Sequence, residues 1–70
     1  MNIRDVKDRF EKELMDFEGV VGVGIGVREG EECIIVFVKK IDKKIVESIP
    51  KNINRYKVYI EEVGKLIKYK

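Results

Sequence analysis

The sequence predicts an α+β fold, a two-layer α/β sandwich in which two helices pack on a three-stranded mixed sheet. Apolar residues recur at helical spacing at the start of the chain and again before Pro50. Three other segments are typical of strands: one alternates aliphatic residues with glycine, one is continuously apolar, and one alternates apolar with polar residues. A chain of 70 residues has room for one domain, which we assign to residues 1–70.

The first element is predicted to be a helix that follows Asn2, a residue suited to the N-cap position. Its apolar residues lie three or four positions apart and so share one helical face. They are Ile3, Val6, Phe10, Leu14 and Phe17. Gly19 suits the left-handed position just beyond a helix C-terminus. We therefore expect this helix to pack on the sheet through its apolar face.

The second element, Val20–Val27, is predicted to be a strand with two very different faces. Side chains alternate between the faces of a strand. The odd-numbered residues from Val21 to Val27 then form an apolar row, and the even-numbered glycines from Gly22 to Gly26 form a bare row. Such a bare row favours close approach of another backbone or helix.

The apolar run Cys33–Val38 predicts a strand that is buried on both faces. The polar segment Arg28–Glu32 connects it to the glycine strand, and Gly30 can take the positive φ that a tight turn needs. The two strands are therefore expected to form a hairpin. Cys33 is interpreted as a small core residue, because no histidine is present to activate its thiol.

The last elements are predicted to be a short helix and a third strand. The helix is expected over Asp42–Ser48, because Pro50 disfavours helix at the residue before it. Asn52 and Asn54 indicate a turn, and Tyr56–Val63 alternates as a strand does. A helix between two strands predicts that these strands run parallel. Leu66, Ile67 and Tyr69 are expected to extend the last strand beyond a bend at Gly64.

An ordered series of short motifs resembles a known module. The series is Gly19–Gly26, an apolar strand that ends in Val38-Lys39-Lys40, then Ile49-Pro50-Lys51 with Ile53, and finally Glu62-Val63-Gly64. It resembles a short module found ahead of trypsin-like peptidase domains in uncharacterised bacterial proteins, over roughly residues 17–64. The resemblance implies an accessory domain and assigns no residue role. The peptidase domain is absent, and without histidine no trypsin-like triad can form.

The composition argues against an enzyme and against a bound cofactor or metal. The chain has no histidine and a single cysteine, so we predict no disulfide and no site built from histidine and cysteine. The acidic cluster of Glu29, Glu31 and Glu32 is interpreted as solvated charge, with a weak calcium site as the alternative, and we predict no metal site. Gly22, Gly24 and Gly26 lack the spacing of a dinucleotide-binding loop, and a hairpin follows them where that loop needs a helix. No small-molecule ligand is evident.

The same composition suggests a cytoplasmic protein from a thermophile. Charged residues make up 40% of the chain and are mostly lysine and glutamate, as in hyperthermophilic proteomes. A lone cysteine fits a reducing compartment, and no apolar run is long enough to span a membrane.

The leading functional hypothesis is a non-enzymatic protein-interaction or self-association module. A chain this small buries a marginal core, and it needs another source of stability such as self-association. Two helices cover one face of a sheet, which leaves a face or an edge of the sheet free for a homodimer or a protein partner. The candidate surface comprises Gly22, Gly24, Gly26, Val23 and Ile25.

The alternative hypothesis is single-stranded nucleic-acid binding by the C-terminal half. Residues 1–32 hold 5 basic and 9 acidic side chains, whereas residues 33–70 hold 10 basic and 4 acidic ones. Proteins that bind single strands combine positive charge with aromatic rings. The candidate residues are Lys39, Lys40, Lys43, Lys44, Arg55, Lys57 and Tyr59. A surface of solvated ion pairs, or pairing between the acidic and basic halves, also explains the charge.

Overall fold

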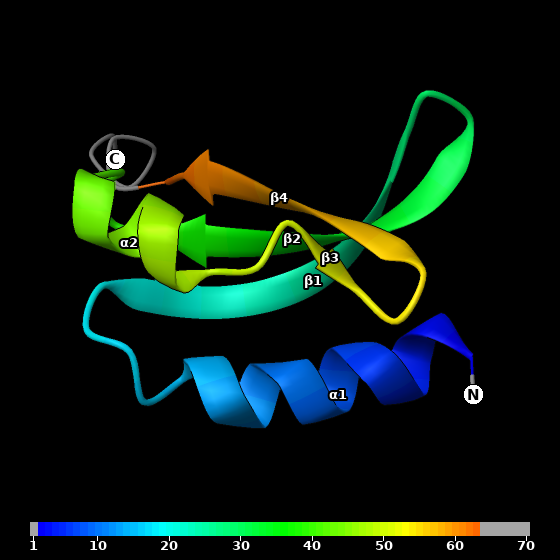
Figure 1. Cartoon of the computed structure of the whole chain (residues 1–70), viewed down its shortest axis with the longest axis horizontal. Helices are drawn as coiled ribbons and strands as arrows, with labels where there is room; N and C mark the ends of the chain where they lie inside the picture. Colours follow the sequence, from blue (N-terminus) through cyan, green and yellow to red (C-terminus); the bar gives the residue numbers. More distant parts are fainter. Residues whose placement is uncertain (1, 64–70) are drawn as a thin grey trace, which may run out of the picture.

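The computed structural model describes residues 2–63 and shows a mixed α+β fold (Figure 1). Its elements are α1 (Ile3–Leu14), β1 (Val20–Arg28), β2 (Glu31–Val38), α2 (Lys43–Ser48), β3 (Asn52–Ile53) and β4 (Tyr56–Glu62). The sheet has four strands in the order β1-β2-β4-β3. The prediction of two helices on a mixed sheet is confirmed, and the prediction of three strands is wrong by one.

Helix α1 begins where the sequence predicts and ends a turn earlier. The Asp5 backbone N–H donates to Asn2 Oδ1 over 3.0 Å, which completes the expected N-cap. On the outer surface Lys7 Nζ donates to Glu11 Oε1 over 2.9 Å, and this bond raises the pKa of the Lys7 ammonium. Phe17 lies beyond the helix, where its N–H donates to the Leu14 carbonyl. Gly19 has the expected positive φ of 96°, but it ends a short loop instead of the helix.

Strands β1 and β2 form the predicted hairpin, with a tighter turn than expected. Arg28 pairs with Glu31, so the turn contains only Glu29 and Gly30. Their φ angles of 55° and 78° are both positive, as in a type I′ turn. At the other end the register shifts between Val20 and Gly22, which leaves Val21 as an extra residue.

Strands β2 and β4 run parallel, as the intervening helix predicts. Helix α2 begins after Asp42, whose Oδ1 accepts the Ile45 N–H over 2.9 Å. Ile49 ends it, directly before Pro50. The expected extension of the last strand by residues 66–69, and the bend at residue 64, lie outside the described residues.

The additional strand, β3, occupies the segment that the sequence predicts as a turn. Asn52 pairs with Lys57 and Ile53 pairs with Tyr56, antiparallel to β4. Asn54 has a φ of 57° in the turn between them. A strand of two residues has no side-chain periodicity, so only its backbone pairing reveals it.

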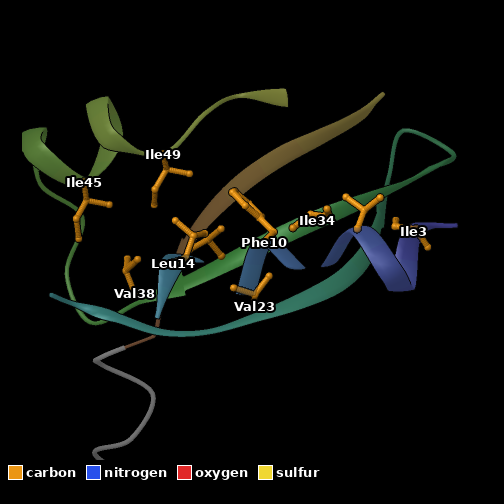
Figure 2. Packing of buried hydrophobic residues seen from close by; sticks show 10 residues of the cluster. Ile3, Phe10, Leu14, Val23, Ile34, Val38, Ile45 and Ile49 are labelled. Atoms are coloured by element: carbon orange, nitrogen blue, oxygen red, sulfur yellow. The ribbon is translucent and has the colours of Figure 1, made fainter. Parts of the chain in front are cut away.

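The core lies between the two helices and one face of the sheet, here called the helix face (Figure 2). Opposite residues of paired strands share a face. Val23 pairs with Val36, and Val36 pairs with Ile60, so these three lie on the helix face. Both helices contribute to the same cluster, which contains Ile3, Val6, Phe10, Leu14, Ile45 and Ile49. The fold is thus a two-layer arrangement, with the opposite face of the sheet away from α1 and α2.

Candidate interaction site

Strand β1 forms one edge of the sheet, with only β2 beside it among residues 2–63. Arg28 and Glu31 close a two-residue hairpin, so the backbone groups of Arg28 point toward β2. Because these directions alternate along a strand, the N–H and C=O groups of Val23, Ile25 and Val27 point outward. An edge of this kind can pair with another strand.

The side chains on β1 divide the edge into a covered part and an open part. Val23 is 7% exposed beneath α1 and belongs to the core. Ile25 is 41% exposed and Val27 is 64% exposed, although both lie on the helix face. Helix α1 therefore shields the middle of β1, and the half that approaches the hairpin turn presents aliphatic side chains to solvent.

The three candidate glycines lie on the opposite face of the sheet, here called the glycine face. Gly24 pairs with Ile35, and Gly26 pairs with Cys33. A Cβ at Gly26 would lie 2.5 Å from Ile35 Cδ1, and one at Gly24 would lie 3.1 Å from Phe37 Cε2. The side chains of Phe37 and Ile35 therefore spread over Gly24 and Gly26, whereas a Cβ at Gly22 would have nothing within 4 Å. Contact of this kind helps to bury Ile35 on a face that carries neither α1 nor α2.

A charged and aromatic group completes the glycine face. The Arg28 guanidinium carbon lies 5.5 Å from the centre of the Tyr59 ring, and Arg28 Nη2 lies 3.9 Å from Glu61 Oε2. Arg28 thus reaches from β1 across β2 to β4. The Arg28 cation therefore occupies one face of the Tyr59 ring.

The basic candidate residues lie in different parts of the molecule: two grooves, a turn and the start of α2. Lys39, Lys40 and Lys44 line a groove of about 430 Å³ beside Phe17, and Glu18 and Asp42 line the same groove. Lys57 and Tyr59 line a different groove, of about 400 Å³, between α2 and β4. Arg55 lies in the β3–β4 turn and Lys43 begins α2. The described residues do not gather the seven candidates on one surface.

The five candidate interaction residues all lie on β1, yet their side chains do not form one surface. Val23 is in the core, Ile25 is exposed on the helix face, and the glycines lie on the glycine face. What they share is the backbone of an edge strand. Sequence reasoning missed Val27, the most exposed large aliphatic residue among those described. The signal was available, because Val20–Val27 contains neither charge nor proline, the residues that usually protect an edge.

Comparison with known proteins adds no relative. No protein-family model, curated protein or solved structure matches the chain. The resemblance to the module ahead of peptidase domains therefore stays a prediction. Within residues 2–63, no helix has the length and apolar character to cross a membrane, and no group of three or more histidine, cysteine or acidic side chains is placed to hold a metal ion.

Proposed function

We propose that the protein is a non-enzymatic interaction module that self-associates by pairing β1 with β1 of a second copy. The observation that carries the proposal is the open half of this edge strand. There the backbone of Ile25 and Val27 points outward, and both side chains are exposed. Protein edges of this length are usually shortened, charged or covered.

Two-fold symmetry makes the pairing self-complementary. An antiparallel pairing centred on Gly26 sets Ile25 of each copy opposite Val27 of the other. Both residues have outward backbone groups, so each such pair can exchange two hydrogen bonds. Their side chains then cover each other on the same face of a continuous sheet. The contact is isologous and closes at two copies.

Sedimentation velocity over a range of protein concentrations tests the proposal. We expect a dimer in the wild type and at least a tenfold weaker dimer when Val27 is replaced by lysine, because a charge on an edge strand opposes pairing. Val46→Lys is the matched control, since Val46 is 42% exposed on α2, an element that takes no part in this pairing. A wild-type monomer at about 1 mM, a concentration at which even weak pairs associate, would contradict the proposal. Equal weakening by both substitutions would also contradict it.

A further inference from the structure

The opposite edge of the sheet is also incomplete. Strand β3 pairs only with Tyr56 and Lys57, and the Val58 N–H donates to the Lys51 carbonyl over 2.9 Å. Beyond Val58, no described strand lies on this side of β4. The Val58 N–H therefore points away from β2. Because backbone directions alternate along a strand, the N–H and C=O groups of Ile60 and Glu62 also point away from β2. This second edge is separate from β1.

A groove follows this edge, here called the β4 groove. It has a volume of about 400 Å³, and its apolar lining comes from Val46, Ile49, Pro50, Val58 and Ile60. Helix α2 and the segment after it form one wall, and β4 forms the other. An edge strand beside an apolar groove is the arrangement that binds extended peptides by strand addition, in which the backbone supplies hydrogen bonds and the groove receives alternate side chains.

The charges around the β4 groove define the peptide it fits. Lys51 and Lys57 line the groove, and none of the acidic residues within 2–63 lines it. Glu62 lies at the far end of the strand and is exposed. A peptide antiparallel to β4 would place its C-terminal end near the two lysines and its N-terminal end near Glu62. Charge complementarity therefore favours acidic residues at the C-terminal end and a cation at the N-terminal end.

We propose that the β4 groove binds an extended peptide that pairs antiparallel with Ile60 and Glu62, inserts an aliphatic side chain beside Val46 and Ile49, and carries acidic residues toward Lys51 and Lys57. This binding does not depend on self-association through β1. The two edges of the sheet thus have different partners: a second copy at β1 and a peptide at β4.

The test uses the full chain and the synthetic peptide Lys-Val-Thr-Val-Asp-Glu with free termini. Titration followed by backbone NMR is expected to shift the amides of Tyr59–Glu62 and to slow hydrogen exchange at Ile60 and Glu62. Two control peptides isolate the mechanism. The reversed sequence Glu-Asp-Val-Thr-Val-Lys has the same composition with opposite polarity, and an N-methylated version lacks alternate backbone donors. Both are expected to bind at least about tenfold more weakly.

Matched variants locate the site. Lys57→Glu is expected to weaken the peptide by about tenfold, whereas Lys43→Glu, an equal charge change on α2 outside the groove lining, leaves its affinity within about twofold. No shift at millimolar peptide, equal binding of the reversed or N-methylated peptide, or equal effects of the two variants would overturn the proposal. Repeating the titration on Val27→Lys separates the two edges. If this variant is monomeric and still binds the peptide, the result supports the β4 site. If it loses both the dimer and peptide binding, the claim that peptide binding is independent of self-association is overturned.

Discussion

At the scale of single residues, the hairpin turn contains an identifiable strain. Glu29 has a φ of 55°, in the left-handed region, where residues other than glycine, asparagine and aspartate are disfavoured. Asparagine followed by glycine is the preferred pair for a type I′ turn. We expect Glu29→Asn to raise the free energy of unfolding by about 0.5–1 kcal/mol, as measured by urea denaturation.

A charge effect could imitate this gain, since Glu31 and Glu32 lie nearby in the sequence. Glu29→Gln removes the same charge and keeps a side chain that disfavours a positive φ. It is therefore expected to change the free energy of unfolding by less than about 0.5 kcal/mol. If the glutamine variant matched the asparagine variant, charge repulsion and not the turn conformation would be the cause.

At the scale of elements, the three glycines of β1 are predicted to differ in their tolerance of a methyl group. A Cβ at Gly26 meets Ile35 Cδ1, whereas one at Gly22 has nothing within 4 Å. We expect Gly26→Ala to lower the free energy of unfolding by about 0.5–1.5 kcal/mol, because Ile35 Cδ1, the movable end of its side chain, must shift to admit the methyl group. Gly22→Ala is expected to be neutral or to add up to about 1 kcal/mol, because alanine restricts the unfolded chain. Thermal or chemical denaturation of both variants measures the difference.

A double variant identifies the atom responsible for the cost at Gly26. Ile35→Val removes Cδ1, the atom nearest the added methyl group. The substitution costs about 0.5–1.5 kcal/mol in the wild type and is expected to cost less when Gly26 is alanine. Additive effects in this cycle would show that the glycine is needed for another reason.

The elements also show how far the sequence could predict the fold. Helix α1, the β1–β2 hairpin and the parallel pairing of β2 with β4 follow from periodicity and connection type, and the structure confirms them. The extra residue at Val21 was missed because alternation in sequence continues through a bulge. As a consequence Val20, and not Val21, packs against the core.

The candidate sites were harder to predict because they depend on strand order. The sequence indicated an apolar strand that could associate, and the structure places that strand at an edge. The β4 groove requires two facts that no local pattern contains. One is that β4 lies beside β2 on the side away from β1, and the other is that β3 ends after two residues. Lys51 and Lys57 come together only because β3 turns back along β4.

At the scale of the whole molecule, stability and self-association are expected to be linked. The described core is built from one layer of helices on one face of a small sheet, and Cys33 is unpaired, so no disulfide supports it. A dimer that only the folded state can form raises the stability of that state by mass action. The melting temperature of the wild type should therefore increase between about 10 μM and about 1 mM protein.

The Val27→Lys variant turns this linkage into a specific test. Val27 is 64% exposed, so its replacement removes little burial from the monomer. At the lowest concentration the variant and the wild type should melt at similar temperatures, and only the wild type should gain stability as concentration rises. If neither melting temperature changed with concentration, any difference between the two proteins would arise within the monomer. If both melting temperatures increased in parallel, pairing would not involve the open half of β1.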